Sequence, residues 1–412
     1  MTIAALEALS FGLGRTAAAA ERAGHRFVLL TGDRSVYRHE LAQLPPGALT
    51  VVDTDTSDEG AVRAALAALP DLAGLVNTTD TWSVPAAGIA ASLGLPGPDP
   101  KAVRVLRDKA RVRELLHRAG LSPGGALPVA PGPGSVAEVL REVGLPAVLK
   151  DSAGTSSRDV WIVHDEDALR AALAEAAGRR LAGRLFAERF LAGPLYSAET
   201  LTWAGTTRLL GVLSRQTSRR PAVREEAAAF PVALPPGRSE RLAEWVGRVL
   251  AAAGHDGGFA HVEFVLTADG PGLVEINRRI GGALVGEALC RSLGTDVYDA
   301  LVDTVLGRRP ALLDADLAHT GPACGMVLVY ADRPGTLTGW HGLDGLGAFP
   351  GAVGWYPTRA PGDTVAHVGD QRGCTGIVLA EAETAELALH RAWSAAVTVR
   401  PVLRDDTARP GA

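Results

Sequence analysis

The fold of this chain is decided by the stretch His261-Val262-Glu263-Phe264 and, after a turn, Glu275-Ile276-Asn277-Arg278-Arg279-Ile280-Gly281-Gly282. Hydrophobic and polar residues alternate in both arms, which predicts two β-strands joined by a tight turn over residues 267–272. With the turn centred on Asp269, the predicted register places Glu263 opposite Glu275 on the same face of the hairpin.

Two carboxylates directly across a sheet repel each other, so we expect a cation between Glu263 and Glu275. Together with the amide oxygen of Asn277 they form a set of hard oxygen ligands, which suits Mg²⁺ held partly by substrate phosphates. Arg279, two residues beyond Asn277, would extend from the same face towards those phosphates. The alternative is a solvated antiparallel hairpin with a charged outer face.

The composition describes an ordinary globular protein with ample material for a core. Its 412 residues suggest two to four domains, and 47% hydrophobic residues with a net charge of −5 argue against disorder. No basic stripe with interleaved aromatic residues occurs, so nucleic-acid binding is not expected. No apolar run reaches membrane-spanning length, so a membrane protein is not expected either.

Cysteine usage and the N-terminal residues favour a cytoplasmic protein. Cys290, Cys324 and Cys374 are scattered without a paired spacing, which argues against a disulfide framework or a zinc site and fits a reducing compartment. The first 14 residues carry Glu7 and lack a positively charged start, so a secretory signal is not predicted.

Lysine is rare in this chain, which makes each lysine a candidate for a specific role. Of 41 basic residues only Lys101, Lys109 and Lys150 are lysines. Lysine is a compact point charge on a flexible stem and suits a phosphate oxygen in a tight site. We interpret Lys101, in a proline-flanked turn, as a surface residue.

The N-terminal 100 residues predict a small parallel sheet, because strand-like and Ala-rich helical segments alternate. The expected strands are residues 3–9, 26–31, 51–53 and 72–77, and the expected helices are 16–23, 60–69 and 85–93. The first strand-to-helix turn, Gly12-Leu13-Gly14-Arg15-Thr16-Ala17, fits the Gly-x-Gly-x-x-Gly/Ala pattern of dinucleotide-binding proteins, and Asp33 ends the next strand. A Rossmann-type oxidoreductase is therefore an alternative.

The middle of the chain predicts a strand–loop–strand flap. A short apolar strand ends in Lys150, the polar loop of residues 151–158 follows, and a second strand spans residues 160–163. The N–H and hydroxyl groups of such a loop can cover phosphates, although a plain β-hairpin with a polar turn would have the same pattern. Further on, we expect strands at 185–190, 196–202 and 208–213, helices at 239–253, 286–306 and 384–397, β segments from residue 321, and a disordered tail after Pro401.

Taken together, these segments resemble the ATP-grasp superfamily of carboxylate–amine ligases, most closely its dipeptide-forming L-amino acid ligase type. The resemblance covers nearly the whole chain. It is carried by an ordered set of motifs: Asp108-Lys109, Leu149-Lys150 with its Ser/Gly loop, Glu188-Arg189-Phe190-Leu191-x-Gly193-Pro194, His261-x-Glu263, and Glu275-Ile276-Asn277-x-Arg279-x-Gly281-Gly282.

The resemblance implies an α/β (α+β) fold with four parts in chain order. These are an N-terminal Rossmann-like βα domain (1–105), a small ATP-grasp subdomain with the phosphate-covering loop (106–184), a large ATP-grasp subdomain with the metal site (185–310), and a C-terminal β-rich extension (311–412).

The resemblance also implies a role for each matched residue. The metal ligands would be Glu263, Glu275 and Asn277, and Arg279 would be the catalytic residue that steadies the transferred phosphoryl group. Apart from the resemblance, His261 is a catalytic candidate because it lies on the same face, as a base or substrate contact, and a structural role is the alternative. The ATP-binding set would be Lys109, Lys150, Ser152, Gly154, Thr155, Ser156, Ser157, Glu188, Arg189 and Leu191, with the last three bordering the adenine. The implied cofactors are ATP and one or two Mg²⁺ ions, which Mn²⁺ could replace.

Candidate substrate contacts are less well matched. Gly281 and Gly282 follow Arg279, and Arg372 lies in Asp370-Gln371-Arg372-Gly373, which resembles a segment that holds the substrate carboxylate, although a surface loop fits as well. The family commonly has an acidic residue for the ribose hydroxyls just after Gly193-Pro194. This chain has Leu195 there, so ribose recognition must come from elsewhere or be weak.

The activity implied is ATP-dependent formation of an amide bond. A carboxylate, expected to be that of an amino acid, would be converted to an acyl-phosphate, and an amine would displace phosphate. The expected partners are therefore two small-molecule substrates, in a cytoplasmic enzyme of natural-product biosynthesis that could form a homodimer. A biotin-carboxylase-like enzyme and a nucleotide-binding protein without catalysis are further alternatives.

Overall fold

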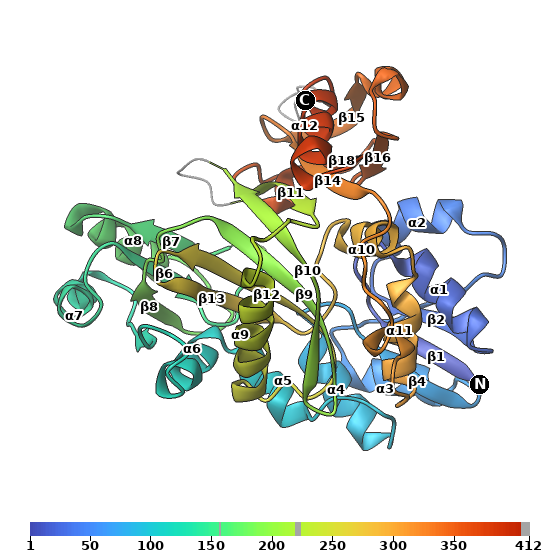
Figure 1. Ribbon diagram of the computed structural model, residues 1–412, viewed down its shortest axis with the longest axis horizontal. Coiled ribbons are helices and arrows are strands. Elements are labelled where there is room, and N and C mark those ends of the chain that lie inside the picture. The colour runs from blue at the N-terminus through green and yellow to red at the C-terminus, as the bar shows by residue number, and fades with distance from the viewer. Residues whose placement is uncertain (156–157, 219–223, 405–412) are drawn as a thin grey trace, which may run out of the picture. The chain divides into compact units, whose positions relative to one another are not determined.

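The computed structural model describes residues 1–155, 158–218 and 224–404. The chain forms two compact units, each built from segments far apart in the sequence (Figure 1). Unit 1 comprises residues 1–97, 210–233 and those from 279 onward, and unit 2 comprises residues 98–209 and 234–278. The domain boundaries expected at 105, 184 and 310 remain predictions.

Unit 1 begins with the predicted parallel sheet. Its strand order is β3-β2-β1-β4, with every pair parallel. The side chains of Leu6, Leu30 and Ile89 are fully buried between the sheet and its helices. The elements are β1 (Thr2–Leu6), α1 (Leu13–Arg22), β2 (Arg26–Thr31), α2 (Arg38–Gln43), β3 (Thr50–Asp53), α3 (Glu59–Ala67), β4 (Leu72–Val76) and α4 (Ser83–Ser92).

The remainder of unit 1 is the predicted β-rich region. An antiparallel sheet runs in the order β10-β11-β14-β18-β16, and a smaller one in the order β17-β15-β19. Helix α12 packs on β14 and β18, and it can do so closely because Gly325 has no side chain: a Cβ there would lie 2.4 Å from the carbonyl carbon of Ala388. The elements are β10 (Thr206–Thr217, which begins in unit 2), β11 (Glu225–Phe230), α10 (Val285–Leu293), α11 (Val297–Val305), β14 (Ala323–Tyr330), β15 (Gly335–His341), β16 (Gly354–Pro357), β17 (Thr364–Val365), β18 (Cys374–Ala382), α12 (Ala385–Ala396) and β19 (Arg400–Arg404).

Two expectations for this region were wrong. The helix expected over 286–306 is divided into α10 and α11, because Gly294 adopts a left-handed conformation (φ +64°) and Asp296 caps the second helix. The tail expected to be disordered after Pro401 pairs with β15 as far as Arg404, and its remaining residues, 405–412, lie outside the described residues.

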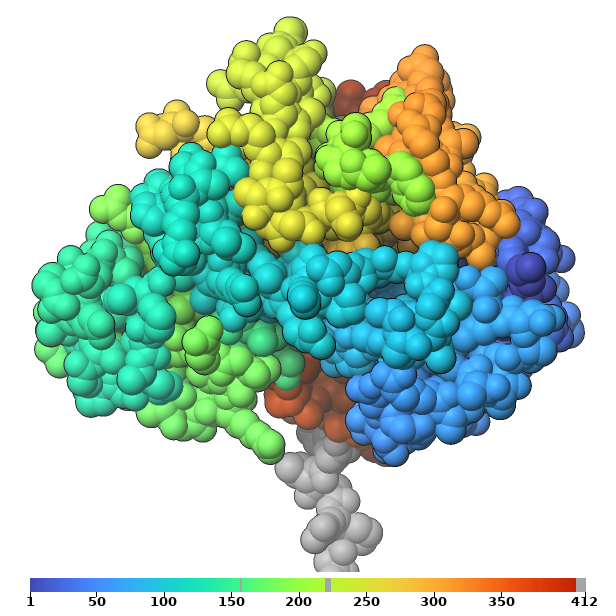
Figure 2. All heavy atoms as spheres, turned by 90° about the horizontal axis from the view of Figure 1, so that it is seen from below, coloured from blue at the N-terminus to red at the C-terminus, as the bar shows by residue number. Residues whose placement is uncertain are grey.

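Unit 2 contains a small lobe around Lys150, drawn in teal to green in Figure 2. Its antiparallel sheet has the order β5-β8-β6-β7, and two helices cover one face through the buried residues Val139, Leu169 and Leu173. The elements are β5 (Leu127–Pro128), α7 (Val136–Glu142), β6 (Ala147–Asp151), β7 (Val160–Val163), α8 (Glu166–Ala177) and β8 (Leu185–Arg189).

Unit 2 also contains the predicted hairpin, which together with β9 forms one end of an eight-stranded sheet, in the order β13-β12-β9. One face is apolar: the ring of Phe264 stacks on Tyr196 and meets the edge of Trp245 on α9. Because side chains alternate along a strand, Glu263 lies on the opposite face. The elements are α5 (Pro100–Arg107), α6 (Lys109–Arg118), β9 (Leu195–Trp203), α9 (Arg238–Ala252), β12 (Gly258–Thr267) and β13 (Gly270–Asn277).

Candidate active site

The register expected from the sequence holds at the carboxylate pair, but the turn is shorter than the expected 267–272, because β12 continues to Thr267 and β13 begins at Gly270. Glu263 pairs with Glu275, and His261 pairs with Asn277. The register then shifts, so that Phe264 pairs with Leu273 and Val274 is an extra residue on β13. This bulge leaves the Val274 carbonyl available to accept a hydrogen bond from Lys150 Nζ at 3.2 Å. The same irregularity that bends β13 therefore brings a lysine to the carboxylate face.

The three predicted metal ligands lie on neighbouring positions of β12 and β13 in unit 2. Asn277 Nδ2 donates to Glu275 Oε1 at 2.8 Å, and His261 Nε2 lies 3.3 Å from Glu263 Oε1. Lys109 Nζ lies 3.2 Å from Glu275 Oε2. Its positive charge offsets the repulsion expected between the facing carboxylates of Glu263 and Glu275.

The donor chemistry of this group fits Mg²⁺. Two carboxylates and an amide oxygen are hard ligands, and the side chains of Glu263 and Glu275 are 15% and 23% exposed. Within the described residues, no three His, Cys, Asp or Glu side chains are arranged as a metal site by themselves. A cation here would therefore depend on Asn277 and on oxygens from a bound phosphate, as Mg²⁺ commonly does.

Lys150 on β6 belongs to a buried ion cluster with Glu188 on β8 and Arg113 on α6. Glu188 accepts from Lys150 Nζ through Oε1 and from Arg113 Nε through Oε2, both at 2.6 Å. The three side chains are only 5–8% exposed. Burial lowers the pKa of Lys150, against the opposing effect of Glu188. Burial alone would raise the pKa of Glu188, but the charges of Arg113 and Lys150 outweigh it and lower this pKa.

The loop after Lys150 is tied to the start of α6. Lys109 Nζ donates to the carbonyl of Gly154 at 2.6 Å, and its backbone N–H donates to the carbonyl of Ser152 at 2.9 Å. The hydroxyl of Ser152 accepts from the N–H of Arg184 at 3.1 Å, so this side chain holds the loop in place. Thr155 follows within the described residues, whereas Ser156 and Ser157 lie outside them.

The predicted adenine-bordering segment lies at the end of β8. Glu188 uses its side chain in the ion cluster, Arg189 is exposed, and Leu191 lies against Gly272, where a Cβ would be 2.8 Å from Leu191 Cδ1. Leu195 occupies the first position of β9. Contact of this segment with adenine remains a prediction.

Arg279 belongs to unit 1, where Asp80 holds its guanidinium. Asp80 Oδ2 accepts from Arg279 Nε at 2.9 Å and from Nη2 at 2.6 Å, and both side chains are 14% exposed. Asp80 follows β4, at the carboxyl edge of the parallel sheet. The glycines after Arg279 lie in the turn that leads into α10, where Gly282 accepts from the N–H of Val285.

Arg372 lies in a short helical turn and pairs with Asp370, at 2.9 Å through Nε and 2.6 Å through Nη2. The neighbouring Gln371 donates to Glu225 Oε2 at 3.4 Å. Arg372 is therefore part of a folded polar segment of unit 1, and its contact with substrate remains a prediction.

The glycine turn of the N-terminal sheet does not have the properties of a dinucleotide site. The N–H of Gly14, which would face a pyrophosphate, donates to the carboxylate of Glu40 at 2.8 Å. A Cβ on Gly12 would lie 2.0 Å from the hydroxyl of Tyr298, so this glycine is needed for close packing. A carboxylate at the start of α1 argues against the oxidoreductase alternative.

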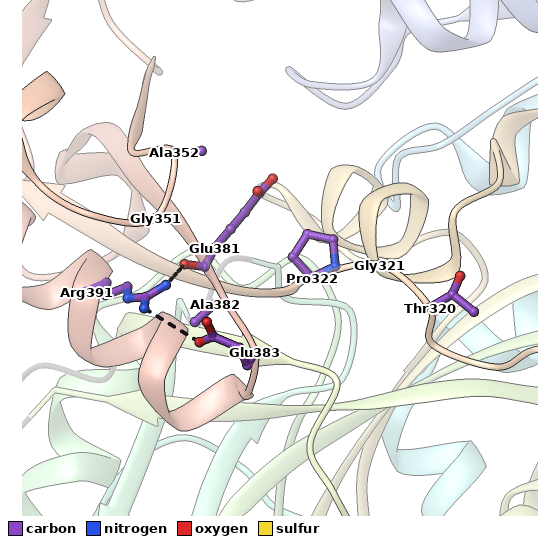
Figure 3. A pocket seen from close by; sticks show the side chains of 9 residues that line it. All are labelled: Thr320, Gly321, Pro322, Gly351, Ala352, Glu381, Ala382, Glu383 and Arg391. Carbon is purple, nitrogen blue, oxygen red and sulfur yellow. Dashed lines mark hydrogen bonds and ion pairs between the residues drawn. The ribbon is translucent and has the colours of Figure 1, made fainter.

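Unit 1 also has a cavity of about 420 Å³ that holds none of the predicted residues (Figure 3). Arg391 crosses it, donating to the carbonyl of Glu381 at 2.8 Å and lying 3.5 Å from Glu383. The carboxylate of Glu381 pairs with Arg291 at 2.7 Å. These charges are matched within the protein, so we assign no ligand to the cavity.

Sequence reasoning missed Arg113, Glu199 and Asp80. Arg113 could have been found, because it lies one helical turn after Lys109 on the same face of α6. Glu199 and Asp80 carry no distinctive local pattern. Their roles depend on partners 62 and 199 residues away in the sequence.

Comparison with known proteins identifies two domains. Residues 143–287 match the ATP-grasp domain, and residues 327–404 match the L-amino acid ligase C-terminal domain 2. A crystal structure of an L-amino acid ligase from Bacillus licheniformis has a TM-score of 0.80 at 20% identity, covering 98% of this chain and 99% of that one. The uncharacterized protein y4rH of Sinorhizobium fredii (strain NBRC 101917 / NGR234) is 27% identical over 86% of this chain and 73% of its own length.

Human carnosine synthase 1 is 27% identical over 58% of this chain, but the match spans only 31% of that enzyme.

The two domain matches confirm the predicted resemblance and fold class: an α/β chain with an ATP-grasp core and a β-rich C-terminal region. They also confirm the prediction of an ATP-dependent ligase with ATP as its cofactor. Across the described residues, no helix is both long and apolar enough to cross a membrane.

Proposed function

We propose that this chain activates the carboxylate of an amino acid as an acyl-phosphate and joins it to an amine, releasing ADP and phosphate. The observation that carries the proposal is the register of β12 and β13, which sets Glu263, Glu275 and Asn277 side by side with Lys109. A merely solvated hairpin would not require a lysine bound to one of its facing carboxylates.

Glu263, Glu275 and Asn277 would hold Mg²⁺, which when bound would offset the negative charge that develops on the transferred phosphoryl group. Lys109 and Lys150 would add fixed positive charge for the phosphate oxygens. The ion cluster with Glu188 holds the Lys150 side chain in place despite its burial. The loop from Ser152 to Thr155 would exclude water, because an acyl-phosphate is hydrolysed readily.

Arg279 would steady the phosphoryl group and the acyl-phosphate, with its guanidinium oriented by Asp80. Arg372, Gly281 and Gly282 are the proposed substrate contacts. Proximity of the bound amine would supply much of the second step. From the sequence, we also propose that the enzyme is cytoplasmic, forms a homodimer and takes part in natural-product biosynthesis.

The proposal is tested by trapping the intermediate. With ATP, Mg²⁺ and one amino acid, hydroxylamine should yield a hydroxamate, and the true amine should replace it with an amide and speed ADP release. Oxygen-18 placed in the carboxylate should appear in the released phosphate. Release of AMP, or transfer of the label to AMP or water instead of phosphate, would exclude the acyl-phosphate route. ADP release that requires bicarbonate in place of an amine would favour a carboxylase.

A further inference from the structure

Three neighbouring strands of unit 2 place six polar residues in two rows on one face of the sheet. Residues paired across antiparallel strands share a face. The first row, across β9, β12 and β13, is Glu199, His261 and Asn277, and the second is Ser197, Glu263 and Glu275. Four of the six are the residues singled out in the sequence, and Ser197 and Glu199 extend the group onto β9.

The two residues of this group on β9, Ser197 and Glu199, are its most deeply buried members. Glu199 is 1% exposed, and its carboxylate contacts Nδ1 of His261, which is itself 4% exposed. The other ring nitrogen of His261, Nε2, lies 3.3 Å from Glu263 Oε1. An ionised carboxylate accepts hydrogen bonds, and an imidazole ring can donate from either nitrogen, depending on its tautomer. His261 thus links a buried carboxylate to the partly exposed Glu263.

Ser197 gives an independent indication that a ligand completes this face. Its side chain is fully buried, directly across from Glu263. Its hydroxyl has no hydrogen-bond partner among the residues that the structure describes. A buried hydroxyl without a partner is unfavourable, and such groups in native proteins commonly mark the place of a bound water, ion or ligand.

We propose that Ser197, Glu199 and His261 are positioning residues that hold the Glu263 carboxylate in place for a divalent cation bound with the nucleotide. This inference rests on the proposed function. Glu199 orients the His261 ring, the ring fixes one oxygen of Glu263, and the Ser197 hydroxyl finds its acceptor in the cation-bound state. Groups that hydrogen-bond to metal ligands commonly contribute about 10- to 100-fold to metal affinity.

This assignment differs from a general base. A base needs a nitrogen lone pair directed at the substrate, whereas both ring nitrogens of His261 contact carboxylates. The variant His261→Gln distinguishes positioning of Glu263 from general-base catalysis, because glutamine keeps an N–H donor for Glu263 but cannot take up a proton. A positioning role is partly rescued by glutamine, and a base is not.

The test measures binding of Mn²⁺ in the presence of ADP, with free Mn²⁺ followed by electron paramagnetic resonance. We expect His261→Ala and Glu199→Gln to weaken Mn²⁺ binding by about 10- to 100-fold, and His261→Gln to recover most of it. Ser197→Ala should fold, because it only removes a buried unpaired hydroxyl, and should weaken Mn²⁺ binding several-fold. ADP affinity without metal should stay at the wild-type value. His255→Gln is the matched control, since His255 is also buried in unit 2 but its ring hydrogen-bonds only to the carbonyl of Gly258 among the contacts that the structure describes.

Unchanged Mn²⁺ affinity in Ser197→Ala, together with unchanged affinity in Glu199→Gln or His261→Ala, would overturn the positioning assignment. So would a His261→Gln protein that binds Mn²⁺ normally but has lost turnover, since that pattern belongs to a base. If the wild-type protein itself binds no Mn²⁺ with ADP, the proposed function fails instead. The wild-type measurement therefore separates the two.

Discussion

Glu188→Gln is the substitution whose effect follows most directly from the structure. The glutamine keeps the shape of the side chain but removes the single anion that lies between Lys150 and Arg113, each 2.6 Å from a carboxylate oxygen. Those two cations are 6% and 5% exposed, so water cannot replace the lost charge. We expect the strands β6 and β8, which carry Lys150 and position 188, to lose local stability.

The expected magnitude follows from the cost of leaving a buried charge unpaired. Removing one partner of a buried ion pair costs about 3 to 5 kcal/mol, against a total folding stability of roughly 5 to 15 kcal/mol. A loss of about 4 kcal/mol corresponds to roughly a thousandfold increase in local opening. With Glu188 gone, the pKa of Lys150 should fall further, because burial and Arg113 both lower it. ATP affinity should therefore drop as well.

Hydrogen exchange of peptides from β6 and β8, followed by mass spectrometry, measures this opening. The control is Glu114→Gln, which removes an exposed pair with Arg118 on α6 and should change stability by less than about 1 kcal/mol. If β6 and β8 in Glu188→Gln exchange no faster than in this control, the ion cluster does not stabilise the lobe and our reasoning is refuted.

The same cluster predicts the direction of the acid response. Because the pKa of Glu188 is lowered in the folded protein, the unfolded chain binds more protons as pH falls below the ordinary value of 4.5. The stability contributed by Glu188 is complete above that pH and is lost as pH falls through the folded-state pKa. Protection of β8 in the wild type should therefore decline in acid, and Glu188→Gln should lack this part of the decline.

Three further substitutions test the proposed chemistry. Glu275→Gln should lower turnover by roughly 100-fold or more while circular dichroism stays unchanged, since even partners of metal ligands commonly contribute 10- to 100-fold; near-normal turnover would exclude Glu275 as a ligand. Lys150→Arg keeps the charge but introduces the bulkier planar guanidinium, so the rate of ATP use should drop sharply. Lys101→Arg, at an exposed position, should leave the kinetics unchanged. Equal kinetics in both variants would count against a contact between Lys150 and phosphate. Asp80→Asn should lower kcat by about 100-fold through misplacement of Arg279, whereas loss of hydrogen exchange protection without any kinetic change would indicate a purely structural pair.

Local pattern in the sequence was enough to predict most of the strands and helices and the face that carries Glu263 and Glu275. Alternation in the segments around Glu263 and Glu275 predicted that these two residues face each other, and β12 and β13 have that pairing. The bulge between this pair and the turn was not predicted. The scarcity of lysine predicted specific roles for Lys109 and Lys150, and each forms an ion pair with a glutamate. These features depend on local pattern, which a sequence displays directly.

The partners of the candidate site residues, by contrast, could be read only from the folded structure. Periodicity tells which face of a strand a side chain occupies, but the residues opposite that face come from distant segments. Arg113 reaches Glu188 across 75 residues, and Glu199 reaches His261 across 62. The glycine turn at Gly12 has the pattern of a dinucleotide site, yet its space is taken by Tyr298, 286 residues later, because packing between distant segments is set by the whole fold.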